Sequence, residues 1–307
     1  MINATMLGSF TLLGFKDSSA KYRLTLFALT LLCYIVIIFV NVGLILTIIL
    51  EEKLHKPMYI FLCNLCFNSL YGTAAFHPKF LFDLLSNTHV ISYAGCLLQV
   101  FFIYSYATMD FSILAVMSYD RYLAICRPLE YHSIMTKQRV TFLVCFSRLV
   151  PMICQSVVVI MSSKLILCGF QIEKLYCENW SFIKLSSQVV VPAFNYTFYF
   201  GHAVFIVWTY VYLVKSCKTS EENRNKFMQT CLPHLLTLMI FIGSVLFDLL
   251  YVRFGSKELS ENMQNFMAIE FLVIPPVINP LIYGLRLTQL RKRLSKSSVV
   301  LFVKFHS

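Results

Sequence analysis

Long runs of hydrophobic residues, separated by short polar and basic stretches, form the main pattern along this chain. A membrane-spanning helix needs roughly 20 mostly apolar residues, and each run reaches that length. The runs cover residues 24–50, 58–85, 93–126, 140–161, 189–214, 227–252 and 266–285. The pattern predicts an all-α membrane protein whose single domain is a seven-transmembrane helix bundle over residues 24–285. Residues 1–23 and 286–307 are then tails on either side of the bundle.

Composition narrows the classes of function. Hydrophobic residues make up 58% of the chain and charged residues 13%, about half the charged share of a soluble domain. Seven spans leave no room for a soluble catalytic domain. No nucleophile–base pair, metal cage or phosphate loop is found at a usable spacing, so we expect neither an enzyme nor a cofactor. No internal repeat is visible, which weakens a transporter interpretation.

The net charge of +11 comes from Lys and Arg placed between the apolar runs. This placement fits the positive-inside rule in a lipid bilayer and argues against a nucleic-acid partner. An extracellular amino terminus gives the expected excess of positive charge on the cytoplasmic side, although Lys21 and Arg23 oppose it. Without a cleavable signal peptide, the first run is expected to act as its own insertion signal. Asn3 begins an acceptor sequon on the outer tail and is a predicted glycosylation site, and Asn179 is a weaker one.

Two motifs at the inner end of the bundle predict a conformational switch. Asp120 and Arg121 end the third run, where an arginine can reach toward the bundle or toward a partner while the aspartate holds it. We call this pair the latch. Prolines in the seventh run free backbone carbonyls and kink the helix. Asn279 is expected to satisfy these carbonyls, and Tyr283 to swing at the inner end, making a hinge beside the latch.

Acidic residues within the runs are candidates for function because they are costly in a membrane. Asp110 can bind a sodium ion, carry a proton, or be a hydrogen-bonded core acid. Asp248 and Arg253 can contact a polar ligand or pair with loop residues. The role of Glu270 stays open.

A candidate ligand pocket lies in the outer half of the bundle. It would be apolar with a few hydroxyl groups, which suits a small organic molecule, although each residue can equally be ordinary core. Its candidate residues are Ile103, Tyr104, Ala107, Thr108, Phe111, Phe194, Phe198, His202, Asp248, Arg253 and Ile269. After the last run, leucines and basic residues take opposite faces, which predicts a short amphipathic helix on the inner membrane surface.

Several motifs resemble those of vertebrate odorant receptors, which are rhodopsin-like (class A) G-protein-coupled receptors. The resemblance covers nearly the whole chain. The matching segments are residues 54–62 (LHKPMYIFL), 78–81 (PKFL), 117–126 (MSYDRYLAIC), Thr209-Tyr210, Lys226 with Thr230-Cys231 and His234, and 276–283 with Arg286.

The resemblance implies a receptor in the plasma membrane, in sensory-neuron cilia. It would bind a small-molecule odorant and activate a heterotrimeric G protein of the stimulatory olfactory type, raising cyclic AMP. Asp120 would hold Arg121 at rest, and on activation Arg121 would meet the carboxy-terminal helix of the G protein. The switch residues implied are Asp120, Arg121, Tyr122, Tyr210, His234, Asn279, Pro280 and Tyr283. A disulfide between Cys96 and Cys177 is implied as well.

The chain departs from the family pattern at three positions. Ser69 replaces the usual acid beside Asp110, which weakens the sodium interpretation. Ser187 replaces the cysteine that would pair with Cys168, and Ile242 replaces a usual tyrosine. Among alternatives, an opsin needs a lysine in the seventh run, which has none, and an amine receptor needs an acid at Ile103. Another rhodopsin-like chemosensory receptor, or a transporter or channel, remains as an alternative.

Overall fold

A computed structural model gives the structure of the chain and is almost entirely helical. It describes residues 8–14, 19–164, 171–172, 175–177, 190–219, 231–232, 234–244 and 261–286. The long helices are α2 (Ala20–Leu50), α3 (Pro57–Leu85), α4 (Tyr93–Cys126), α6 (Lys137–Ser163), α8 (Val190–Thr219) and α10 (Glu261–Arg286), with a further helical segment at His234–Ser244. The short elements are a 3₁₀ helix at Glu52–Leu54 and α5 (Tyr131–Ile134).

These helices confirm the predicted fold class. In the described part of the chain, four helices are long and apolar enough to cross a membrane: α2, α4, α6 and the Thr197–Ser216 part of α8. The apolar parts of α10 and of the sixth run are shorter where they are described. The count of seven crossings therefore stays a prediction.

Some helices begin a few residues before the predicted apolar run, because a polar side chain caps the helix there. The predicted third helix matches α4 at both ends. By contrast, α2 begins at Ala20 because the Ser19 side chain accepts a hydrogen bond from the Tyr22 amide. Thr136 caps α6 at Lys137 in the same way. Capping satisfies free backbone N–H groups, so the helix extends past its apolar part.

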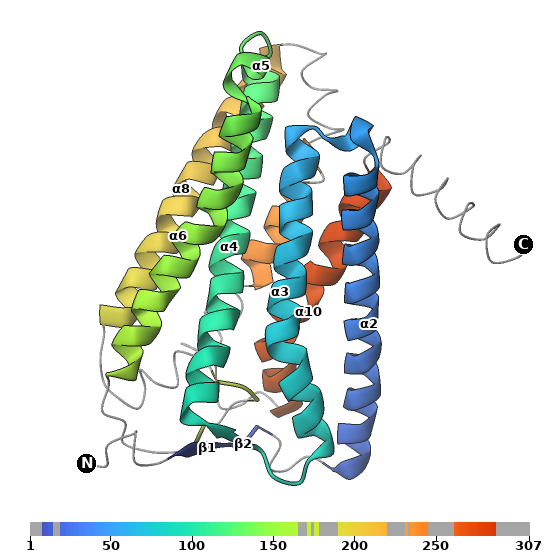
Figure 1. The fold of residues 1–307 in the computed structure, drawn as a ribbon, viewed down its shortest axis with the longest axis vertical. Helices are drawn as coiled ribbons and strands as arrows, with labels where there is room; N and C mark the ends of the chain where they lie inside the picture. The colour runs from blue at the N-terminus through green and yellow to red at the C-terminus, as the bar shows by residue number, and fades with distance from the viewer. Residues whose placement is uncertain are drawn as a thin grey trace, which may run out of the picture.

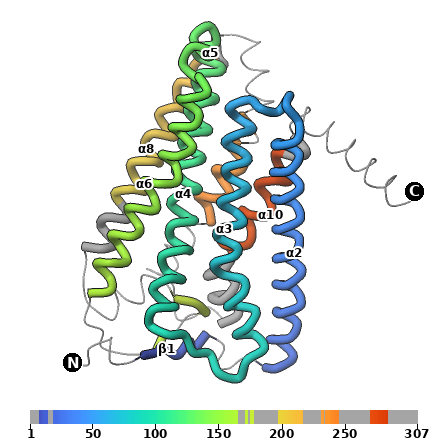
Figure 2. The backbone as a smooth tube through the Cα atoms, viewed as in Figure 1, coloured from blue at the N-terminus to red at the C-terminus, as the bar shows by residue number. Residues whose placement is uncertain are grey.

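Helix α4 is the centre of the bundle. Every residue from 105 to 118 is buried, as expected for a helix with neighbours on all sides. It packs against α3, α6 and α8, while α10 packs against α2 and α3 (Figure 2). The most apolar windows of α2 and α6 are only 28% and 22% buried, so these helices present apolar side chains to lipid.

A small sheet, which the sequence did not predict, lies at one end of the bundle, opposite α5 (Figure 1). Its strand order is β2-β1-β3. Strand β1 (Ser9–Leu12) pairs antiparallel with β2 (Val90–Ser92) and parallel with β3 (Gln171–Ile172). Phe10 and Leu12 are buried in the same apolar cluster as Cys96 and Cys177. The amino-terminal segment is thus part of this end of the fold, which the sequence predicts to be the outer one.

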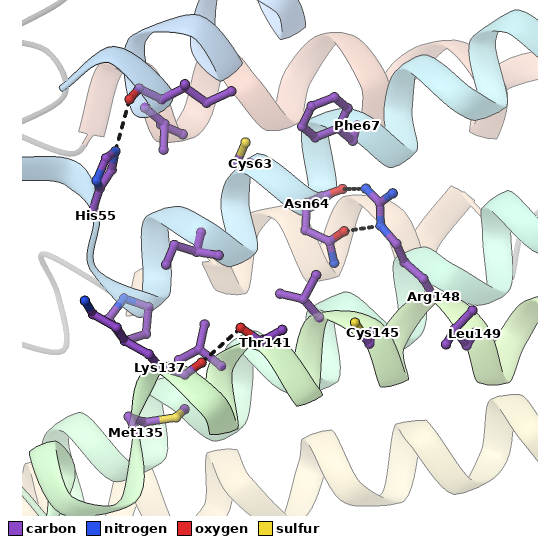
Figure 3. Close-up of a pocket in the computed structure, with 16 residues that line it drawn as sticks. His55, Cys63, Asn64, Phe67, Met135, Lys137, Thr141, Cys145, Arg148 and Leu149 are labelled. Carbon is purple, nitrogen blue, oxygen red and sulfur yellow. Dashed lines mark hydrogen bonds between the residues drawn. The ribbon is translucent and has the colours of Figure 1, made fainter. Parts of the chain in front are cut away.

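A groove of about 990 Å³ opens on the outside of the bundle between α2, α3 and α6. His55 and Lys137 lie at one end of the groove, and Asn64 and Arg148 lie toward the other (Figure 3). Leu149 on its rim is 56% exposed. The groove therefore faces the surroundings of the bundle rather than its core.

Candidate ligand site and activation switch

The latch residues are paired and buried at the inner end of α4. Arg121 donates from Nε to Asp120 Oδ2 at 3.0 Å, and its Nη2 donates to the same oxygen. Asp120 is fully buried and Arg121 is 8% exposed. The structure therefore pairs the arginine with its neighbouring aspartate, and the resting role of this pair stays a prediction.

Tyr131 of α5 holds the latch from a second element. Its hydroxyl donates to Asp120 Oδ1 at 2.7 Å, so both carboxylate oxygens of Asp120 are used. Burial, followed by the charge of Asp120, raises the pKa of Tyr131, which keeps the hydroxyl protonated and able to donate. Sequence reasoning missed this residue, because only folding of the loop brings α5 back against α4.

Tyr210 and His234 join three helices near the latch. The Tyr210 hydroxyl and His234 Nδ1 are 2.5 Å apart, and the two rings stack. His234 Nε2 lies 3.2 Å from the Leu114 carbonyl oxygen of α4. The structure thus brings two predicted switch residues together and links them to α4.

Tyr122, next to Arg121, packs against the residues of α8 on either side of Tyr210. Its ring packs against Trp208 and Tyr212 of α8, with centroids 5.7 and 6.0 Å away. The side chain therefore contacts an aromatic surface of α8.

One expectation for the seventh helix is wrong. Pro280 has no N–H, so the Pro276 carbonyl loses its usual helical partner. Asn41 of α2, rather than Asn279, donates to this carbonyl at 2.9 Å. Asn279 is buried, and its side-chain atoms make no hydrogen bond to the described residues. A contact between residues 235 positions apart could not be inferred from local spacing.

Tyr283 of α10 is fully buried in the main core cluster, as are the neighbouring turns of α4. Pro275 likewise frees the Phe271 carbonyl, and the Tyr106 hydroxyl of α4 lies 3.5 Å from that oxygen. The prolines of α10 therefore create polar contacts with both α2 and α4.

Asp110 lies in the core between α3 and α4. Asn68 donates to its Oδ1 at 2.7 Å, and Tyr106, one turn earlier, interacts with it as well. Ser69 is buried, and its hydroxyl makes no hydrogen bond to the described residues. An amide donor on Oδ1 is the contact expected of a hydrogen-bonded core acid. Sodium or proton binding by Asp110 stays a prediction.

The candidate ligand residues of α4 and α8 lie on facing sides of their helices. Phe111 packs 5.0 Å from Tyr199 of α8 and 5.0 Å from Phe241 of the sixth run, measured between ring centroids. His202 Nε2 lies 3.0 Å from the Ser112 hydroxyl, and Phe198 packs on the His202 ring. Phe111 thus lies where α4, α8 and the sixth run meet, whereas Ser112, the next residue of α4, and His202 of α8 line a pocket of about 400 Å³ that α6 closes.

One other candidate, Thr108, has less polar capacity than predicted. Thr108 is buried, and its hydroxyl donates to backbone carbonyls of its own helix at 2.8 and 3.1 Å. Ala107 is buried beside it, whereas Tyr104 is half-buried. The hydroxyl lining predicted for this part of α4 is therefore partly used within the helix.

Several predicted residues lie outside the described part of the chain. They are Asn3, Cys168, Asn179, Ser187, Asp248 and Arg253, together with the amphipathic segment after Arg286. Ile269 and Phe194 lie in helices whose backbone the structure describes, but their side chains are not among the described ones. Their roles stay predictions.

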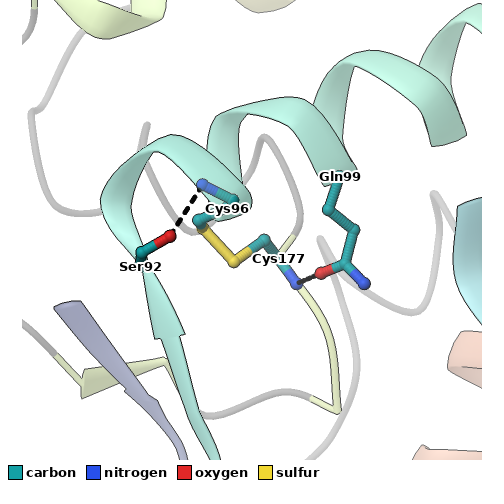
Figure 4. The surroundings of a disulfide bond; sticks show 5 residues. Ser92, Cys96, Gln99 and Cys177 are labelled. Carbon is teal, nitrogen blue, oxygen red and sulfur yellow. Dashed lines mark hydrogen bonds between the residues drawn. A yellow bond between two sulfur atoms is a disulfide. The ribbon is translucent and has the colours of Figure 1, made fainter. Parts of the chain in front are cut away.

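The implied disulfide is present at the outer end. Cys96 at the start of α4 is bonded to Cys177, 81 residues later (Figure 4). Gln99 accepts a hydrogen bond from the Cys177 amide at 2.9 Å, and Ser92 caps the first turn of α4. The bridge and the Gln99 contact attach the loop to the end of α4.

The architecture places the chain in a known class of membrane protein. The crystal structure of squid rhodopsin matches it with a TM-score of 0.75, covering 92% of this chain and 83% of that chain at 17% identity. The helices therefore have the rhodopsin fold, that of the G-protein-coupled receptors.

Sequence comparison then gives the family. The family model described as "Olfactory receptor" matches residues 30–300. Human olfactory receptor 11H6 is 32% identical, covering 94% of this chain and 88% of the relative. Mouse olfactory receptor 5B21 is 33% identical, covering 96% and 94%. The chain belongs to the olfactory receptor family, so it is a multi-pass receptor and not an enzyme.

Proposed function

We propose that the chain binds a small odorant in the outer half of the bundle and activates a stimulatory olfactory-type G protein, raising cyclic AMP. It would do so in the plasma membrane of sensory cilia with its amino terminus outside. The observation that carries this proposal is the buried latch, in which Asp120 holds Arg121 and Tyr131 holds Asp120. A buried ion pair at a helix end would serve as a two-state element if activation released Arg121.

The ligand would contact the junction of α4, α8 and the sixth run. Phe111 supplies an aromatic surface and His202 a polar group near it. A mostly apolar site with a few polar groups suits a small amphipathic odorant. The proposed polar character also depends on Asp248 and Arg253. Activation by apolar odorants alone, with unchanged responses in Arg253→Ala, would contradict it.

The signal would pass inward along the helical segment His234–Ser244. Phe241 touches Phe111, and His234 lies two turns further along the same segment. His234 contacts the Leu114 carbonyl and Tyr210. A ligand that shifts Phe241 relative to α4 would strain these contacts and favour a second arrangement in which Arg121 is released.

The G protein would dock on the inner surface around the latch. Leu129, between α4 and α5, is 97% exposed. A fully exposed leucine gives this surface an apolar contact for a partner, and the Arg127–Glu130 ion pair lies beside it. Sequence reasoning missed Leu129, because the loop alone does not show which side chains stay uncovered.

Expression with an olfactory-type G protein and a broad odorant panel tests the proposal by cyclic AMP. We expect an odorant-dependent rise that Arg121→Ala reduces at least tenfold at equal surface expression. Arg139→Ala is the matched control, because Arg139 is an arginine of α6 outside the latch. A full response in Arg121→Ala would refute the switch. Solute flux across the membrane without any cyclic AMP response would favour the transporter or channel alternative.

A further inference from the structure

The groove between α2, α3 and α6 has a lining that neither the ligand junction nor the latch uses. Its walls are largely apolar, with Ile49, Ile60, Val144 and Leu149 among them. Its polar lining includes the cationic side chains of Lys137 and Arg148, and no aspartate or glutamate is among its lining residues. The groove is therefore apolar, cationic and open to the membrane.

Arg148 has only neutral partners among the described residues. Its Nε donates to Asn64 Oδ1, and its Nη2 lies 3.5 Å from the Asn64 carbonyl oxygen (Figure 3). The Phe67 ring lies 5.7 Å from the guanidinium carbon. The ion pairs of the described residues do not include Arg148. An arginine within a membrane without an anion is expensive, so it marks a place where a carboxylate would be bound.

The depth of Arg148 decides which anion fits. The apolar part of α6 begins at Val140, after the polar first turn, so Arg148 lies about 12 Å into it at 1.5 Å per residue. This depth is more than a third of a hydrocarbon core about 30 Å thick. A lipid phosphate stays at the headgroup level, and Asn64 and Phe67 hold the guanidinium toward α3 (Figure 3). A second transmembrane helix can carry a carboxylate to this depth.

The exposed side of α6 fits a neighbouring helix. Thr141 and Cys145 are exposed and four residues apart, and Leu149 continues the same stripe beside Arg148. Small residues at this spacing let two helices approach closely in a membrane. We propose that this groove docks a transmembrane helix of another membrane protein, one that carries an acidic side chain opposite Arg148.

A designed single-span helix of leucine and alanine with one central glutamate tests this docking surface. A cysteine placed one turn from that glutamate can form a disulfide with Cys145, an exposed free thiol one turn before Arg148. After co-expression with the full receptor and mild oxidation in membranes, we expect at least five times more cross-linked receptor than with a glutamine version of the helix. Cys145→Ser must remove the cross-link.

Variants of the receptor show whether Arg148 causes the preference for the glutamate helix. Arg148→Gln should make the glutamate and glutamine helices equal, whereas Arg139→Gln, on another face of α6, should leave the preference intact. Thr141→Trp fills the groove without changing its charge and should also remove the cross-link, so the test does not depend on correct folding of Arg148→Gln. Cell-surface amounts are compared for all variants.

Two results would overturn the proposal. One is equal cross-linking of the glutamate and glutamine helices to the unaltered receptor. The other is labelling of the groove by a photoreactive phosphatidylserine that depends on Arg148 and prevents cross-linking of the helix. The second result would assign the groove to an anionic lipid instead.

Discussion

At the scale of single residues, Asp120 is the side chain on which the inner end depends. One of its oxygens accepts from Arg121 and the other from Tyr131. Because both partners are donors to one buried carboxylate, losing either leaves Asp120 less well compensated. The arrangement therefore couples α4 to the short helix α5.

Replacing Tyr131 by phenylalanine tests this coupling. The change removes the hydroxyl that donates to Asp120 Oδ1 but keeps the ring. A hydrogen bond to a charged group contributes about 1.5–3 kcal/mol. The arrangement in which Asp120 holds Arg121 should therefore be less populated, and cyclic AMP without odorant should rise several-fold. Tyr119→Phe is the matched control, because the Tyr119 ring packs on Phe205 of α8. Unchanged basal cyclic AMP in Tyr131→Phe would show that Asp120 alone holds Arg121.

At the scale of helices and strands, close packing between α3 and α4 fixes the core. Gly72 of α3 faces the ring of Tyr106, which is fully buried in α4. A Cβ atom at position 72 would lie 2.4 Å from that ring. The two helices can therefore approach this closely only because residue 72 has no side chain.

The variant Gly72→Ala should be destabilised. Overpacking of a well-packed core costs about 1–3 kcal/mol, so the thermal unfolding midpoint of the purified receptor should fall by several degrees. Gly43→Ala in α2 is the control, because nothing lies within 4 Å of the Cβ it would add. That variant should keep or slightly raise the midpoint, since alanine favours helix over glycine. Equal behaviour of the two variants would contradict the close approach.

The outer sheet should respond to pH through His89, next to β2. Burial lowers the pKa of His89 from its ordinary value of 6.5; nearby Asp83 raises it, while Arg23 and Lys79 lower it. A histidine with a lowered pKa stabilises the folded state fully above the ordinary value and loses that contribution as the pH falls toward the lowered pKa. Acidification from pH 7.5 to pH 5.5 should therefore loosen the pairing of β1 with the loop before β2.

Hydrogen exchange of the Leu12 amide measures this loosening, because that amide donates to the His89 carbonyl at 2.8 Å. Corrected for the intrinsic pH dependence of exchange, its protection should drop roughly two- to fivefold on acidification. His89→Gln should remove this drop. A similar drop in His89→Gln would assign the pH response to another group.

At the scale of the whole molecule, sequence and structure agree best for features that depend only on residues close together in the chain. Apolar length predicts the helices, and α4 matches the predicted bounds because its apolar run is bordered by a cap at Ser92 and by Arg127. The sheet, the Asn41 contact with Pro276 and the Tyr131 contact with Asp120 were not predicted. Each joins segments that the chain brings together only after the helices have packed, so no local pattern reports them.

The outer end gives a prediction that involves the whole chain, because one bond joins segments 81 residues apart. Cross-linking a loop of that length stabilises the folded state by about 4–5 kcal/mol in the chain-entropy account. Cys96→Ser, Cys177→Ser and the double variant should therefore lose surface expression and thermal stability to the same extent, since each removes the same bond. Cys145→Ser, a free exposed thiol, should lose neither. If the two single losses added up in the double variant, the cysteines would stabilise the outer end separately through packing. Equal losses would instead mean that the sheet, the loop and the start of α4 are held together by this one bridge.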